Sequence, residues 1–271
     1  MLSKGKNMAD LFEKYIFADG CHFKYARGKP AVSGKEFHDY YEIVLFLEGH
    51  SELISEKIRL VLSPGTVVFV PKETFHQFHV TDSDSYLRCI LGFTESDGVS
   101  HLVHDVMSEI MVFPRPSEEI LSVFATLRKA CDGGLSQKEK EILLDSAAKQ
   151  LLIGRRLETF EPTEKYTEVS ELTQKAITYI DENLSGELSL AAVAKASRVS
   201  VSSLSHRFRQ ELNISVYRYI TEKRMSRVRQ YIRNGMSLAD ASKMSGFCDY
   251  SGFYRLYKTM YGQSPSTIKN K

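Results

Sequence analysis

Two stretches near the carboxyl end decide the fold: LSLAAVAKASRVSVSSLSHRFRQELNIS at 188–215 and MSLADASKMSGFCDYSGFYRLYKTMYGQSP at 236–265. Their first parts align at an offset of 48, which places Ser189 on Ser237, and their later parts align at an offset of 49. A repeat with one residue inserted in its turn explains both offsets. We infer that the chain ends in two copies of one structural unit.

Each copy has the pattern of a helix-turn-helix. A serine precedes a short helix rich in small residues, and a turn follows at 197–200 or at 246–249. The next helix carries apolar residues four positions apart, such as Leu204 and Phe208 in the first copy. Small residues let the first helix approach the second closely, while the outer face of the second stays polar and basic. This is what a helix in the DNA major groove requires.

Residues 216–234 between the two copies predict one continuous helix that ends at Gly235. A helix of this length spans about 28 Å. One turn of B-DNA measures ~34 Å. We therefore expect a rigid connector that presents two recognition helices to successive major grooves on one face of the duplex.

The net charge of +2 conceals two parts of opposite character. Residues 171–271 hold 16 Lys and Arg against 8 Asp and Glu, whereas 1–170 hold 20 against 26. Neutralisation of phosphates by Lys and Arg supplies most of the sequence-independent affinity for nucleic acid. We expect the carboxyl-terminal part alone to face a polyanion.

The region before residue 100 predicts a small all-β module. Short β-rich runs alternate with turn residues, and no helical segment separates them, so a sandwich or small barrel is favoured over parallel β-α-β units. Helical periodicity follows from about Ser100, and 158–167 lacks periodicity and is typical of a linker. The expected strands cover 40–47, 58–62, 66–70, 75–80 and 86–92, and the expected apolar helix faces cover 102–111, 120–127 and 142–157.

A larger set of residues resembles the AraC/XylS family of transcription regulators. The dense part covers 171–271, and a looser similarity upstream resembles the cupin-like ligand-binding domain of that family. The chain departs from the family pattern at Asn213, Tyr257 and His206, where Gly, Phe and Arg are usual. The dense part is carried by Gly246-Phe247, Ser251, Phe253, Arg255, Tyr257-Lys258, Gly262 and Pro265, with Leu190 to Ile232 as first motif and linker helix. The looser part is carried by His38-Asp39-Tyr40-Tyr41-Glu42, Glu48-Gly49, Pro64-Gly65-Thr66 and Val70-Pro71 through His76.

The resemblance implies a multidomain chain, with an N-terminal all-β cupin-like barrel with flanking helices and a C-terminal all-α tandem helix-turn-helix domain. We expect a ligand-sensing domain at 1–105, a helical dimerisation segment at 106–160, a linker at 161–170 and a DNA-binding domain at 171–271. The implied function is ligand-responsive, sequence-specific transcriptional regulation, with activation as the expected output. The implied partners are double-stranded DNA at promoter half-sites, RNA polymerase, a small polar effector such as a sugar, and a second copy of the chain.

The family also implies which side chains contact DNA. Arg255 can bond guanine O6 and N7 together, which contributes ~1–3 kcal/mol of discrimination. Sequence choice should therefore depend on the second copy and on His206. The competing interpretation is that these side chains only form solvated helix faces, or intramolecular salt bridges in the case of the arginines. The expected base contacts are Ser202, Ser205, His206, Tyr250, Ser251, Tyr254 and Arg255, and the expected phosphate contacts are Arg207, Arg209 and Lys258.

Alternation along the strands predicts a polar and aromatic ligand site inside the barrel. A metal ion would need three or four inward His or Glu side chains, and His38, Glu42 and His76 are the one plausible set. The His-x-His pair common in metal cupins is absent at 36–38. We therefore expect no metal and no cofactor, and keep two alternatives: a metal-dependent cupin enzyme with an accessory DNA-binding module, and histidines that only form hydrogen bonds. The expected ligand contacts are His38, Glu42, Glu48, His76, Phe78 and Arg88.

Remaining features point to a soluble cytoplasmic protein that is not an enzyme. No apolar run approaches the ~18 residues that cross a bilayer, and 1–14 lacks a secretory signal. The four cysteines show no Cys-x-x-Cys spacing, which disfavours disulfides and a cysteine-rich zinc site. The apolar faces of 102–111 and 143–157 favour a symmetric dimer.

Overall fold

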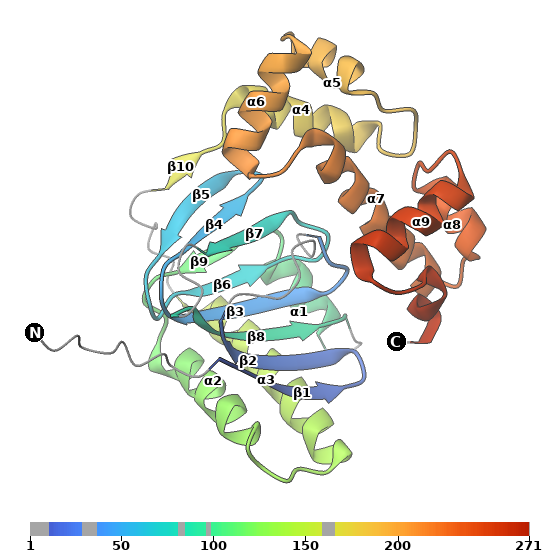
Figure 1. Ribbon diagram of the computed structural model, residues 1–271. Helices are drawn as coiled ribbons and strands as arrows, with labels where there is room; N and C mark the ends of the chain where they lie inside the picture. The colour runs from blue at the N-terminus through green and yellow to red at the C-terminus, as the bar shows by residue number, and fades with distance from the viewer. Residues whose placement is uncertain (1–10, 29–36, 81–84, 96–98, 159–165, 271) are drawn as a thin grey trace, which may run out of the picture.

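The computed structural model describes residues 11–28, 37–80, 85–95, 99–158 and 166–270. Its amino-terminal half contains two facing antiparallel sheets, and its carboxyl-terminal part is helical (Figure 1). The expected combination of an all-β cupin-like module and a tandem helix-turn-helix domain is confirmed.

The strands of the β module form two sheets of different size. One is six-stranded, in the order β1-β2-β8-β3-β6-β9, and the other is four-stranded, in the order β10-β5-β4-β7. The strands are β1 (Phe12–Ala18), β2 (Cys21–Arg27), β3 (Tyr41–Glu48), β4 (Ser51–Ser55), β5 (Ile58–Leu62), β6 (Val67–Val70), β7 (His76–Val80), β8 (Leu87–Phe93), β9 (Met111–Phe113) and β10 (Thr167–Glu168).

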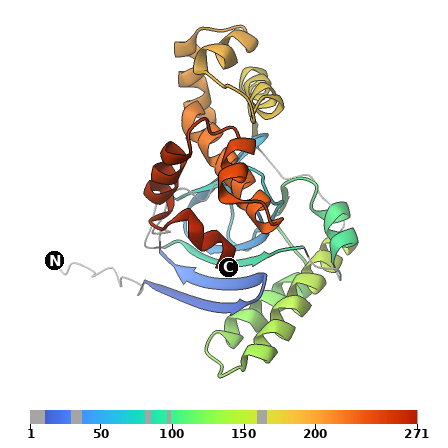
Figure 2. The ribbon, with the colours of Figure 1, turned by 90° about the vertical axis from the view of Figure 1, so that its right-hand side faces the viewer.

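Strand β3 separates two hydrophobic clusters through the alternation of its side chains. Val44 and Phe46 join a cluster between the sheets that also contains Leu53. Ile43 and Leu45 point the other way, into a cluster shared with three helices, α1 (Ser100–Val106), α2 (Glu118–Ala130) and α3 (Gln137–Leu157). Helices α2 and α3 cover the outer face of the larger sheet, below it in both ribbon views (Figures 1 and 2).

The helical part reproduces the repeat residue by residue. Helices α5 and α8 begin 48 residues apart, after the capping serines Ser189 and Ser237, and α6 and α9 begin 49 residues apart. Asn213 and Gly262 end the two recognition helices in the left-handed conformation, with φ of 56° and 69°. The helices are α4 (Glu171–Glu182), α5 (Leu190–Ala196), α6 (Val201–Leu212), α7 (Val216–Arg233), α8 (Leu238–Met244) and α9 (Tyr250–Tyr261), followed by a 3-10 helix at Pro265–Asn270.

Two expectations about elements need correction, and four further elements were not expected. Residues 102–111 do not form one helix, because α1 ends at Val106 and Met111 begins β9, which pairs with β6. The end of the expected linker is a short strand, β10, that pairs with β5, while 161–165 lie outside the described residues. Strands β1, β2 and β4 and helix α4 had no counterpart in the sequence analysis. Among the described helices, none is long and apolar enough to cross a membrane.

Two glycines of the second helix-turn-helix unit provide a test of the backbone. Both have positive φ, but a Cβ on Gly262 would meet no atom within 4 Å, whereas a Cβ on Gly246 would lie 2.4 Å from the Leu184 carbonyl oxygen. We expect Gly262→Ala to lower the free energy of unfolding by about 1 kcal/mol. Gly246→Ala should cost about 3 kcal/mol, since the segment that follows α4 must also move. Urea titrations followed by circular dichroism measure both, and equal losses would contradict the contact with Leu184.

Candidate functional site

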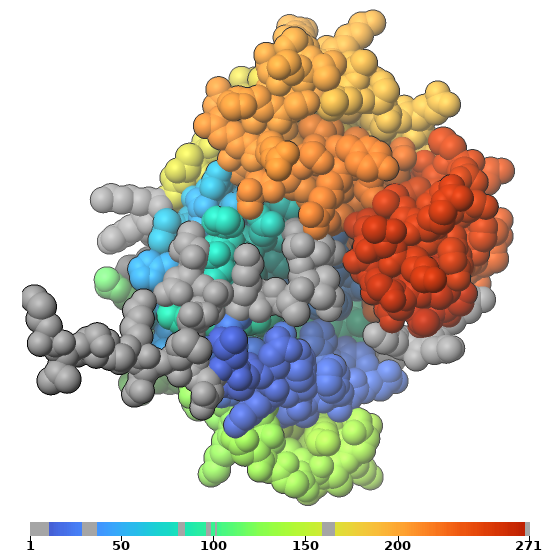
Figure 3. All heavy atoms as spheres, in the orientation of Figure 1, coloured from blue at the N-terminus to red at the C-terminus, as the bar shows by residue number. Residues whose placement is uncertain are grey.

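The two recognition helices α6 and α9 present polar side chains to solvent. Ser202 and His206 are exposed on α6, and Tyr250, Ser251 and Arg255 are exposed on α9. In the space-filling view the first unit lies at the top of the molecule and the second at the right, and both have open surface (Figure 3). These five side chains therefore lie where a duplex could reach them.

Two other residues expected to contact bases form hydrogen bonds within the chain. The Ser205 hydroxyl donates to the Val201 carbonyl at 2.8 Å. The Tyr254 hydroxyl lies 3.0 Å from the hydroxyl of Ser264. Both residues are only half-exposed. A base contact by either side chain would compete with these hydrogen bonds.

The expected phosphate contacts are all on the surface. Arg209 and Lys258 are exposed, and half of the Arg207 side chain is exposed although its guanidinium lies 3.7 Å from a Glu211 carboxylate oxygen. Because the Arg207 side chain is half-exposed and the distance is long, this ion pair is weak and leaves the arginine available to a phosphate.

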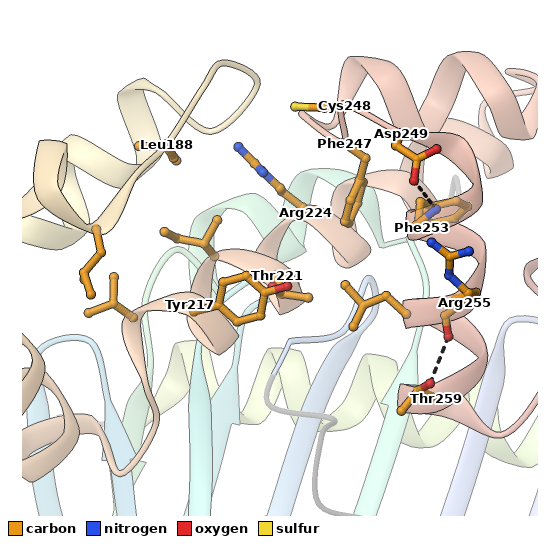
Figure 4. Close-up of a pocket in the computed structure, with 15 residues that line it drawn as sticks. Leu188, Tyr217, Thr221, Arg224, Phe247, Cys248, Asp249, Phe253, Arg255 and Thr259 are labelled. Atoms are coloured by element: carbon orange, nitrogen blue, oxygen red, sulfur yellow. Dashed lines mark hydrogen bonds between the residues drawn. The ribbon is translucent and has the colours of Figure 1, made fainter.

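A groove of about 540 Å³ lies between α7, the second helix-turn-helix unit and the start of α5. Tyr217 and Thr221 of α7 line one side of it, and Phe247 and Arg255 of the second unit line the other (Figure 4). Arg255 therefore lies at the inner edge of its recognition helix, facing the connector between the two units.

Several basic side chains of α7 bond within the helical domain. Arg224 donates to the carbonyls of Leu184 and Gly186 at 3.0 and 2.7 Å, and Arg227 donates to the Ser185 hydroxyl at 2.9 Å. These arginines tie α7 to the segment between α4 and α5. Both arginines are therefore bonded within the chain, to neutral carbonyl and hydroxyl oxygens and not to carboxylates.

Helix α7 also packs on the β module through an aromatic cluster. The Tyr219 ring lies 5.3 Å from those of Phe37 and Phe208 and 5.6 Å from that of Phe75, measured between centroids. All four rings are almost fully buried. The first helix-turn-helix unit therefore shares one hydrophobic core with the β module, hereafter the sensor. Ile54 of β4 also belongs to this core. The second unit has a separate core.

Polar contacts surround this aromatic cluster. The Tyr219 hydroxyl donates to Glu56, and burial together with Glu56 raises the pKa of Tyr219 well above its usual value. Arg229 donates to the Phe37 carbonyl at 2.9 Å, and Arg233 lies 3.1 Å from the Asp39 carboxylate. Segment 37–39 of the sensor is thus held by two arginines of α7.

His38, the middle residue of this segment, forms a buried polar cluster with Glu42 and His76. Each is no more than 7% exposed. The Glu42 oxygen Oε2 lies 3.5 Å from His38 Nε2 and 3.1 Å from His76 Nε2. Burial lowers the pKa of His38, and the nearby Glu42 carboxylate opposes this only in part. The structure therefore brings together three of the six expected ligand residues.

Two further expected ligand residues, Phe78 and Arg88, also belong to the β module but make other contacts. The Phe78 ring packs 5.8 Å from the His76 ring. Arg88 is buried between the sheets, donates to the Gly28 carbonyl and lies 4.7 Å from the Tyr86 ring centroid.

The sixth expected ligand residue, Glu48, lies on the surface, apart from the other five. A register shift between Phe46 and Glu48 breaks the alternation of β3, and the Glu48 side chain is 54% exposed and paired with Arg27 at 2.9 Å. The expectation that Glu48 faces the barrel interior is corrected by this β-bulge.

Two protein families match different parts of the chain. The model of an AraC-like ligand binding domain matches residues 24–152, and that of a helix-turn-helix domain matches 193–271. The chain belongs to the AraC/XylS family of transcriptional regulators. It is a transcriptional regulator with a DNA-binding helix-turn-helix domain and a ligand-binding domain.

Curated relatives of this AraC/XylS regulator match most of both chains. "Probable transcriptional regulator LumQ" of Photobacterium leiognathi is 28% identical and aligns over 84% of this chain and 89% of its own. The Msm operon regulatory protein of Streptococcus mutans is 25% identical over 98% and 94%. The HTH-type transcriptional activator RhaS of Yersinia pestis is 24% identical over 91% and 92%.

Matches among solved structures include ToxT from Vibrio cholerae O395, which is 10% identical, covers 98% of both chains and has a TM-score of 0.42. The C-terminal domain of AraT from Geobacillus stearothermophilus is 25% identical and covers 38% of this chain and 88% of its own, with a TM-score of 0.37.

Asp39 provides a test of the contact between α7 and the sensor. Its carboxylate is 7% exposed and faces Arg229 as well as Arg233. We expect Asp39→Asn to lower the free energy of unfolding by about 1–3 kcal/mol, because the two arginines of α7 lose a buried carboxylate as their charged partner.

The matched control is Asp145→Asn, which removes an exposed ion pair with Lys149 at 2.7 Å. This change should cost about 0.5 kcal/mol or less. Similar urea midpoints for both variants would contradict the assigned importance of the buried contact.

Proposed function

We propose that this regulator binds two successive major grooves of a promoter half-site through α6 and α9. The observation that carries the proposal is the repeat itself: two equivalent helix-turn-helix units with exposed polar recognition faces, joined by the single helix α7. A helix of 18 residues gives about 27 Å between its ends, which is near the spacing of successive grooves.

The proposed effector is a small polar metabolite such as a sugar. One of the relatives supports this proposal by name, since it is the arabinose operon regulatory protein of Salmonella typhimurium. Inside the β module, Arg88 and the His38, Glu42 and His76 cluster supply the buried polar groups that could bond hydroxyls, within walls of apolar side chains.

The proposed mechanism is a shift between two arrangements of the sensor and α7. An effector that binds one arrangement more tightly increases its population and so changes which half-sites are occupied. Segment 37–39 supports this route, because it joins the buried cluster to Arg229 and Arg233. Activation through contact with RNA polymerase is the proposed output, in line with the naming of RhaS as an activator.

A homodimer through α3 is part of the same proposal. Most of the apolar stripe on α3 packs against its own sheet, but Ile142, Ile153 and Leu157 remain 60%, 51% and 78% exposed. Exposed apolar residues on one long helix favour a two-fold symmetric contact. The enzyme alternative is not proposed, because the relatives are named as regulators.

Arg255→Ala tests direct recognition by α9. An arginine bonded to guanine O6 and N7 distinguishes one base pair, so its loss should cost ~1–3 kcal/mol on specific DNA and relax preference at one position. Fluorescence anisotropy with the specific site and with each of its single-base variants measures this. Equal losses on specific and random DNA would exclude the assigned role.

Lys258→Ala is the companion variant on the same helix. A phosphate contact carries no sequence information, so binding should weaken alike on all sequences. The slope of log K against log salt should flatten by about one unit. An unchanged slope, measured between low and moderate salt, would show that Lys258 does not contact a phosphate.

A further inference from the structure

The strongest unassigned feature is the orientation of the two rings in the buried cluster. His38 Nδ1 lies 2.7 Å from the Tyr40 carbonyl oxygen, and His76 Nδ1 lies 3.1 Å from that of Thr74. A carbonyl oxygen only accepts hydrogen bonds, so Nδ1 carries the proton in each ring. In the neutral rings both Nε2 atoms therefore direct a lone pair into the cluster.

The Nε2 atoms meet another group that cannot donate a hydrogen. Both face the Oε2 atom of the Glu42 carboxylate, at 3.5 Å for His38 and 3.1 Å for His76. Among the described residues, His38 Nε2 has no hydrogen-bond partner. Three acceptor atoms thus converge in a region closed to solvent, which is unfavourable unless a cation lies among them.

The distances agree with a metal site. A tetrahedral ion with bonds of about 2.0–2.1 Å separates neighbouring ligand atoms by about 3.3 Å, close to the two measured spacings. All three ligand atoms lie within 4.8 Å of one another, and this is the one such group of His, Cys, Asp or Glu found in the described part of the chain. A small closure of the two rings would complete the geometry.

We propose that His38 Nε2, His76 Nε2 and a Glu42 carboxylate oxygen bind one divalent transition-metal ion, of the class that includes Zn²⁺. Two imidazoles and one carboxylate suit such ions, whereas Mg²⁺ and Ca²⁺ prefer oxygen ligands. The carbonyl oxygens of Tyr40 and Thr74 accept hydrogen bonds from the Nδ1 atoms and so hold each ring with Nε2 facing the ion. Three protein ligands leave a position for water or for an oxygen of a bound molecule.

The location of the site gives the ion a role in regulation, a part of the inference that rests on the proposed function. His38 lies between Phe37 and Asp39, and both of these neighbours contact arginines of α7. Binding of the ion fixes His38 against β3 and β7. It therefore fixes the sensor segment on which α7 docks.

The experiment measures Zn²⁺ bound to the full chain after chelator treatment, by equilibrium dialysis and elemental analysis. We expect one zinc per chain and a rise in melting temperature with added Zn²⁺. His76→Gln and Glu42→Gln should each weaken binding at least ~tenfold. If either variant fails to fold, His38→Gln and the Co²⁺ absorption spectrum of the unsubstituted protein provide the same test.

The matched control is His104→Gln. His104 Nε2 lies 3.1 Å from a Glu95 oxygen, the same spacing as His76 and Glu42. This pair lies at the surface, and the residues that the structure describes add no third ligand to it. The control variant should bind zinc like the unsubstituted protein. Absence of stoichiometric zinc in the unsubstituted protein, or equal affinity in His76→Gln and Glu42→Gln, would overturn the proposal. DNA affinity of the metal-free protein, measured in parallel, tests the proposed function separately.

Discussion

The structure depends on the packing of α7 against the sensor around Tyr219. This one ring contacts Phe37 and Phe75 of the β module and Phe208 of the first recognition helix, and its hydroxyl reaches Glu56. Burying such an aromatic side chain contributes a few kcal/mol, and here the gain is shared by two domains. Because α7 also carries both helix-turn-helix units, the same contact sets where the recognition helices stand relative to the ligand-binding domain.

Local signals made the helix-turn-helix units predictable from sequence. Ser189 and Ser237 cap the first helices, the inserted residue lies in the turn, and Asn213 adopts the left-handed conformation in place of glycine. The main strands were equally accessible because Ile58–Leu62 and its neighbours are bounded by turn residues. All of these features are decided within a few residues of chain.

The features that could not be predicted from sequence depend on contacts between residues far apart in the chain. Met111 continues a helical pattern, yet it pairs with Phe69 at the edge of a sheet, where the hydrogen bonds of β6 override local preference. Glu48 follows the alternation of its strand until a bulge turns it outward. His38, Glu42 and His76 could be grouped from their residue types, but the orientation of their rings depends on the carbonyls of Tyr40 and Thr74.

Because the hydrophobic cores are divided in this way, the two helix-turn-helix units differ in how firmly they are attached to the sensor. The first unit belongs to the core that contains Phe37, Phe75 and Ile54 of the sensor, whereas the second unit closes a core of its own around Met225, Phe253 and Tyr257. Opening the second unit breaks few contacts with the sensor, and opening the first disrupts both domains. Amide exchange should therefore be faster in α8 and α9 than in α6, and on a promoter the second half of each footprint should have the shorter residence time.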